Sequence, residues 1–74
     1  MLKEQSLFII DSIDKECSSE LAKKFSEVGI YPSQLLYLVA ISKKQARIIV
    51  NNVEYVLRKD DFDHLRLIDC EIEE

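Results

Sequence analysis

The chain contains one glycine and one proline in 74 residues, and the two lie three positions apart, at Gly29 and Pro32. Glycine readily adopts the left-handed backbone that ends many helices, and proline cannot continue a helix. We therefore expect one sharp helix end at this point and regular structure joined by short connections elsewhere. A chain with one glycine also cannot form a glycine-rich phosphate-binding loop.

The residues that precede Gly29 predict a helix of about ten residues. Ser18 is a favourable N-cap, and Glu20 places a negative charge in the first turn, where the helix dipole favours it. One apolar stripe follows at helical spacing, formed by Leu21, Ala22, Phe25 and Val28. Gly29 then occupies the position of a left-handed C-terminal cap, and Pro32 prevents the helix from starting again.

Two further segments have the composition of β-strands. Residues 7–13 are rich in β-forming side chains and are followed by the polar stretch 14–16. Residues 35–41 form a continuous apolar run that ends at the polar segment 42–45. The length and flanks of this run predict a strand that is covered on both faces, rather than a helix.

A hairpin is predicted around Asn51 and Asn52, because apolar residues alternate on both sides of them. Asparagine tolerates positive φ angles, so the pair can form a two-residue type I′ turn. This turn would pair Val50 with Val53, and likewise Ile48 with Tyr55 and Ala46 with Leu57, all on one face.

The remaining segments complete a chain of five strands. Residues 59–63 resemble a single helical turn capped by Asp60, and residues 64–70 alternate as a last strand, from His64 to Cys70. Five short, mostly antiparallel strands can bury one face each only by curling together. The sequence therefore predicts a mainly β fold, a small barrel with one α-helix inserted after its first strand, and a single domain over residues 1–74.

The net charge of −4 comes from the acidic tail at residues 69–74. Asp69, Glu71, Glu73 and Glu74 supply four of the fourteen acids, so residues 1–68 carry ten acids against ten bases. A neutral body has no basic excess to attract phosphate backbones, and we expect no nucleic-acid partner.

The composition also predicts a cytoplasmic protein without direct membrane insertion. The longest apolar run has seven residues, against the roughly 18 of a membrane span. The first five residues show no secretory signal pattern. Cys17 and Cys70 form no CxxC motif, which fits a reducing compartment.

Two motifs in register resemble the FeoA family, the small SH3-like proteins of bacterial ferrous iron uptake. The first is the apolar helix that runs into Gly29-Ile30-Tyr31-Pro32-Ser33, and the second is Leu57-Arg58-Lys59-Asp60-Asp61-Phe62 with the spaced Leu65 and Leu67. Ser33 stands where the family usually has glycine, and the family's Gly-Asp-Pro loop is absent. The match covers almost the whole chain in order and length.

This resemblance implies an SH3-like barrel and a non-enzymatic accessory or regulatory protein. Its partner would be the cytoplasmic part of the membrane transporter FeoB, which would place the protein at the inner membrane through that partner. Two alternatives remain: a generic SH3-like adaptor unrelated to iron, and an iron-binding sensor or carrier. Self-association through an unpaired barrel edge is also compatible with the sequence.

The residues themselves favour binding over catalysis. His64 is the single histidine and has no nucleophile near it in the sequence, so we expect it to face solvent and we expect no enzyme. The candidate metal ligands, Cys17, Cys70, His64, Asp11, Asp14 and Glu16, lack the short paired spacing of a dedicated site. We therefore expect no cofactor, with ferrous iron as the alternative to test.

Partner binding is predicted at the corner formed by Phe25, Gly29, Ile30, Tyr31 and Pro32. Phe25 and Ile30 suit the core better than a contact surface. Tyr31 is the better exposed anchor, because an aromatic side chain with a polar tip is favoured at interfaces.

Overall fold

The five strands form one antiparallel sheet in the order β4-β3-β2-β1-β5. The structure is a computed structural model that describes residues 3–70, so residues 71–74 of the predicted acidic tail lie outside the described residues. The elements are β1 Ser6–Ile13, α1 Ser19–Val28, β2 Leu35–Ile41, β3 Gln45–Val50, β4 Val53–Arg58, α2 Lys59–Phe62 and β5 Leu65–Asp69.

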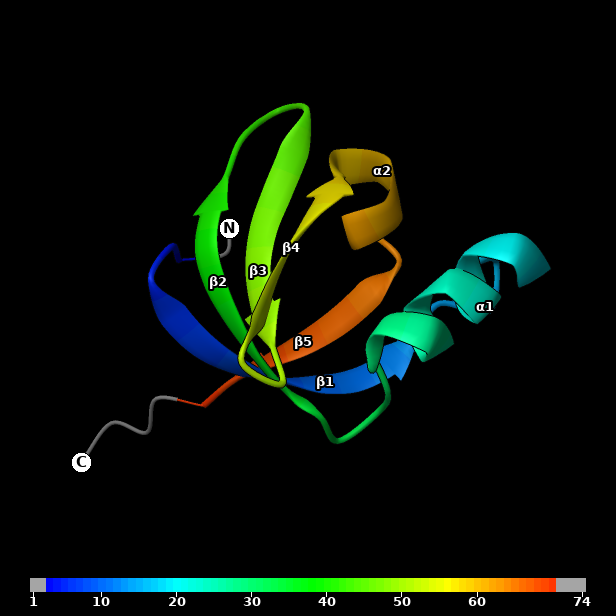
Figure 1. The fold of residues 1–74 in the computed structure, drawn as a ribbon, viewed down its shortest axis with the longest axis horizontal. Helices are drawn as coiled ribbons and strands as arrows, with labels where there is room; N and C mark the ends of the chain where they lie inside the picture. Colours follow the sequence, from blue (N-terminus) through cyan, green and yellow to red (C-terminus); the bar gives the residue numbers. More distant parts are fainter. Residues whose placement is uncertain (1–2, 71–74) are drawn as a thin grey trace.

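The sheet curls into a small SH3-like barrel, which confirms the predicted fold class (Figure 1). Register shifts between Ile10 and Ser12 in β1 and between Leu38 and Ala40 in β2 mark irregularities at which strands bend. Strands β4 and β5 are the two edges of the sheet, and α1 projects to one side of the barrel beside the end of β1.

Helix α1 begins and ends as the sequence predicts. The Ser18 hydroxyl accepts a hydrogen bond of 3.1 Å from the backbone N–H of Leu21. Gly29 has a left-handed backbone with φ of 88°, and the backbone N–H of Ile30 donates to the Phe25 carbonyl at 2.9 Å. Of the predicted apolar stripe, Phe25 is fully buried, whereas Ala22 is exposed. The helix therefore contributes mainly one aromatic side chain to the core.

The β3–β4 hairpin has the predicted register. Asn51 and Asn52 have φ angles of 56° and 67°, as a type I′ turn requires. Val50 pairs with Val53, and the pairs Ile48–Tyr55 and Ala46–Leu57 follow along the ladder. The side chains of β3 that face inward are fully buried or nearly so.

The core lies inside the curled sheet and is closed by Phe25 and Phe62 from the two helices. Its buried apolar members are Phe8, Ile10, Phe25, Ile30, Leu36, Leu38, Ala46, Ile48, Val50, Leu57, Phe62 and Leu65. No side-chain nitrogen or oxygen is buried without a hydrogen-bond partner in the described part of the chain. The core is therefore apolar and free of unsatisfied polar side-chain groups.

The structure corrects the expectation that residues 35–41 are covered on both faces. Leu36 and Leu38 are fully buried, but Leu35 on the other face is 51% exposed. A continuous apolar run can belong to a strand with a single buried face when the chain supplies no second layer to cover the other.

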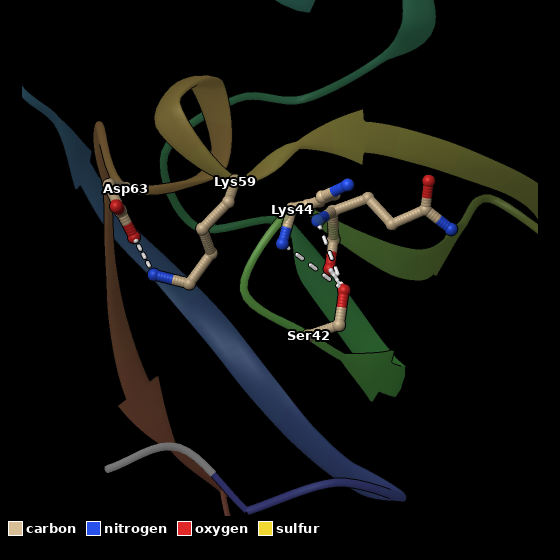
Figure 2. A network of polar contacts seen from close by, with 5 residues as sticks. Ser42, Lys44, Lys59 and Asp63 are labelled. Atoms are coloured by element: carbon tan, nitrogen blue, oxygen red, sulfur yellow. Dashed lines mark hydrogen bonds and ion pairs between the residues drawn. The ribbon is translucent and has the colours of Figure 1, made fainter.

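Helix α2 also differs from the expectation, because Arg58 rather than Asp60 occupies its N-cap and no side chain caps the helix. The backbone N–H of Lys59 instead donates to the Lys44 carbonyl at 2.9 Å, and Lys59 Nζ lies 2.6 Å from Asp63 Oδ1. Figure 2 shows this contact beside the β2–β3 loop, where the Ser42 hydroxyl accepts from the backbone N–H of Lys44. The bond between Lys59 and Lys44 thus joins the start of α2 to the β2–β3 loop.

Ser33 has a positive φ of 75°, a conformation that costs an L-residue roughly 1–2 kcal/mol and that glycine adopts freely. We expect Ser33→Gly to raise the free energy of unfolding by a few tenths to about 1 kcal/mol, because it removes this strain.

Gly29→Val should lower the free energy of unfolding by about 1 kcal/mol or more, since a Cβ atom at Gly29 would lie 2.5 Å from Asn51 Nδ2. Urea denaturation measures both variants. An unchanged midpoint for Gly29→Val would contradict the assignment of Gly29 as the left-handed cap of α1.

Candidate functional site

The outward-facing side of the sheet carries a row of apolar side chains with no covering layer in the described structure. Leu7 of β1 pairs with Tyr37 of β2, and Tyr37 pairs with Ile49 of β3. A second row runs from Leu35 to Ile9 and on to Ile68 of β5. We call these six residues the outer apolar face. Leu35 and Ile68 are each 51% exposed, which is unusual for large aliphatic side chains so close together.

A shallow hollow of about 290 Å³ lies within this face. Its apolar floor comes from Leu7, Leu35, Tyr37 and Ile49, and its polar rim from Gln34, Asn51 and Asn52. Gln34 Nε2 donates to Asn51 Oδ1 at 2.6 Å, so the rim is partly held in place. An apolar floor with a neutral amide rim suits an uncharged, apolar group of a partner better than a charged one.

The predicted corner residues lie beside this hollow, but they do not all face solvent. Phe25 and Ile30 are buried in the core, as expected for them, while Tyr31 and Pro32 are exposed. The Tyr31 hydroxyl donates to the Ser26 carbonyl at 3.2 Å, which folds the ring back towards α1. The close approach of Gly29 to Asn51 joins this corner to the rim. Whether these residues bind a partner stays a prediction.

The sequence reasoning missed the outer apolar face. The signal was present, because Leu35 and Tyr37 alternate with the buried Leu36 and Leu38 in a run that is apolar at every position. To cover both faces of the sheet, the protein would need a second layer of helices or strands, and outside the sheet the described residues form only α1 and the short α2. An apolar run that exceeds the available cover therefore points to an exposed surface.

A second cluster, at the end of β1, is polar. The Asp14 carboxylate accepts from the backbone N–H of Glu16 at 3.1 Å and lies 3.7 Å from His64 Nδ1 and 3.8 Å from Arg66 Nη2. The hydrogen bond from Glu16 and the charge of Arg66 hold the pKa of Asp14 below its ordinary value, although partial burial opposes them. His64 is half-buried at this position, whereas we expected it to face solvent.

Cys17 packs against the core near this cluster, and its thiol is not activated. Burial and the nearby carboxylates of Asp14 and Asp61 raise the pKa of the Cys17 thiol above its ordinary value. A raised pKa lowers the thiolate fraction at neutral pH, and the thiolate is the nucleophile and metal ligand. Cys17 and Cys70 are both free thiols.

The predicted metal ligands do not assemble into one site. Among residues 3–70 there is no group of three or more His, Cys, Asp or Glu side chains placed to hold a metal ion. Asp14 and His64 approach each other, but Arg66 occupies the same carboxylate and would repel a cation. The described residues thus offer ferrous iron no preformed cage.

Within the described part of the chain, no helix is both long and apolar enough to cross a membrane.

No protein-family model matches the chain, and no curated protein matches it either. Among solved structures, the chain is similar to the solution NMR structure of protein PA4359 from Pseudomonas aeruginosa. The two are 18% identical over 95% of this chain and 96% of that chain, with a TM-score of 0.71. At this identity the likeness shows that the fold is shared.

The lowered pKa of Asp14 predicts a pH-dependent contribution to stability. A depressed carboxyl pKa stabilises the folded state above the unfolded value of about 3.9 and ceases to do so as the pH falls through the folded value. Asp14→Ala should therefore lower the melting temperature at pH 7 and make little difference near pH 2. Asp11→Ala is the control, because the exposed Asp11 carboxylate makes no hydrogen bond or ion pair with other described residues. An equal Asp14→Ala effect at both pH values would contradict the assignment.

Anaerobic titration with ferrous iron tests the sensor or carrier alternative. We expect no stoichiometric site of micromolar affinity or tighter, because the candidate ligands are not gathered among residues 3–70. A saturable one-to-one site at micromolar concentrations would overturn this expectation.

Proposed function

We propose that this protein is a non-enzymatic protein-interaction domain that binds an apolar segment of a partner through the outer apolar face. The observation that carries the proposal is the hollow between Leu7, Leu35, Tyr37 and Ile49, with its rim of neutral amides. A large apolar group seated there would cover side chains that now face water, and burying apolar surface is the main favourable term in association.

The fold supports a passive role for the barrel itself. An apolar core without unsatisfied polar side chains and a sheet held by antiparallel ladders make a rigid platform. Binding sites placed on such a scaffold need little reordering when a partner docks, which reduces the entropic cost of association. No nucleophile–base pair is needed for this activity.

The first partner to test is the cytoplasmic part of a FeoB-type ferrous iron transporter. This choice rests on the resemblance of the motifs around Gly29 and Leu57 to the FeoA family, and the protein would then tune the assembly or nucleotide cycle of the transporter. An adaptor role unrelated to iron is the alternative within the same class of function. The outer apolar face would serve either partner, so the experiment must separate the choice of partner from the choice of surface.

Binding to the isolated cytoplasmic domain of the transporter, in both nucleotide states, tests the partner. Leu35→Glu should weaken this binding roughly tenfold or more, because it puts a charge into the apolar lining of the hollow. Val53→Glu is the matched control. The exposed fraction of Val53, 47%, is similar to that of Leu35, but the Val53 side chain lies on the opposite face of the sheet. Surface plasmon resonance measures both variants.

The outcomes separate the two parts of the proposal. An absence of binding in either nucleotide state would contradict the transporter as partner. Binding that Leu35→Glu and Val53→Glu weaken equally would contradict the outer apolar face as the surface. Circular dichroism melting of each variant shows that the folded barrel is what has been tested.

A further inference from the structure

The edge strand β4 has a row of backbone groups that the sheet leaves unpaired. In a two-residue hairpin the residues that flank the turn, Val50 and Val53, form a hydrogen-bonded pair, and such pairs then alternate along the ladder. The N–H and C=O groups of Val53, Tyr55 and Leu57 therefore point towards β3. The bond from the Lys59 N–H to the Lys44 carbonyl continues the same alternation.

The peptide groups of Glu54, Val56 and Arg58 consequently point away from β3, towards the open edge. No other described strand pairs with Glu54 or Val56 across that edge, whereas the Arg58 carbonyl, at the N-cap of α2, accepts the first hydrogen bond of that helix and leaves only the Arg58 N–H for the edge. Their side chains share the outer face of the sheet, and all three residues are exposed, Val56 at 55%. An exposed strand edge of this kind is a template for pairing with another strand.

We propose that the partner of this edge is β4 of a second copy of the chain, paired antiparallel about a two-fold axis at Val56. With Val56 opposite its own copy, Glu54 of each chain lies opposite Arg58 of the other. Val56 and its copy can exchange two main-chain hydrogen bonds, and each Arg58 N–H can donate to the Glu54 carbonyl of the other copy, about four bonds in total. Any other antiparallel register moves the two-fold axis away from Val56 and no longer places Glu54 of one chain opposite Arg58 of the other.

The side chains favour this register because the edge is self-complementary in charge. Opposite charges directly across an antiparallel pair stabilise it, whereas like charges destabilise it. The Arg58 side chain makes no hydrogen bond or ion pair with the other described residues, so its guanidinium is available. Glu54 is bound to Arg47 through Oε2 alone, with Nε at 2.8 Å and Nη2 at 2.6 Å. Its Oε1 can accept Arg58 from the second copy without breaking that pair.

The apolar contact lies at the centre of the same interface. Val56 would meet its own copy on the two-fold axis, between the two Glu54–Arg58 pairs, and both valines would lose exposure to water. A β-branched pair flanked by charge pairs is a favourable cross-strand combination. The outer faces of the two sheets would then become continuous across the axis. This inference goes beyond the proposed function and does not depend on it.

Disulfide trapping tests the register directly. In a Cys17→Ser, Cys70→Ser background, Val56→Cys would place two thiols opposite each other, with a Cα–Cα separation of about 5.5 Å that a disulfide spans. Val53→Cys is the matched control, because Val53 is also exposed and on β4 but would lie opposite Lys59 of the second copy, far from its own copy. Mild oxidation should give a covalent dimer with Val56→Cys and not with Val53→Cys.

Sedimentation equilibrium from about 10 µM to about 1 mM tests the association without a cross-link. Val56→Pro should abolish it, because proline removes an N–H that the β3–β4 ladder does not use and that the dimer requires. Val56→Thr, which keeps the N–H, should retain it. Arg58→Glu should weaken the dimer at least about tenfold, since Glu54 would then face a like charge, and high salt should weaken the unaltered dimer.

Three results would overturn the proposal. One is a monomer throughout the concentration range, and another is association that survives Val56→Pro in a variant whose melting shows it to be folded. The third is equal cross-linking of Val56→Cys and Val53→Cys, which would indicate random collision or a different pairing such as β4 with β5. Because the cross-linking variants keep every backbone N–H, they decide the case even if Val56→Pro does not fold.

Discussion

The two left-handed asparagines between β3 and β4 set the pairing register on which most of the described structure depends. With Val50 opposite Val53, every second residue of the hairpin faces the core, including Ile48 and Leu57. A slip of one residue would turn all of these side chains to solvent. The same register decides which peptide groups of β4 bond to β3 and which remain at the open edge. The core and the free edge thus have one physical origin.

The hairpin turn also links the two halves of the chain. Asn51 lies against Gly29 at the end of α1 and accepts the Gln34 amide at the start of β2. Gly29 has no side chain, and only for that reason can the corner after the helix approach the turn so closely. The rim of the candidate binding hollow is therefore built where two left-handed turns meet, at Gly29 and at Asn51.

The outer apolar face follows from the size of the chain. A curled five-stranded sheet buries its inner face in its own core, and one long helix that contributes mainly Phe25 cannot cover the outer face as well. Strands β1, β2 and β3 nevertheless carry apolar residues on both faces. An apolar surface of this extent is stable in water only at some cost, and partner proteins are the common reason for such surfaces. This is the physical basis of the proposed function.

The helices, strands and turns could be predicted from the sequence, because their signals come from residues close together in the chain. Ser18 and Gly29 bound the helix, Asn51 and Asn52 specify the turn, and alternation sets the inner face of the hairpin. Which side chains are buried, and by which elements, depends on the tertiary structure. The run 35–41 is apolar at every position, so its local pattern alone does not say which of its faces is buried. Asp60 looked like a cap, although the backbone of α2 is tied to Lys44 instead. Exposure and long-range hydrogen bonds depend on residues distant in the chain, so no local pattern contains them.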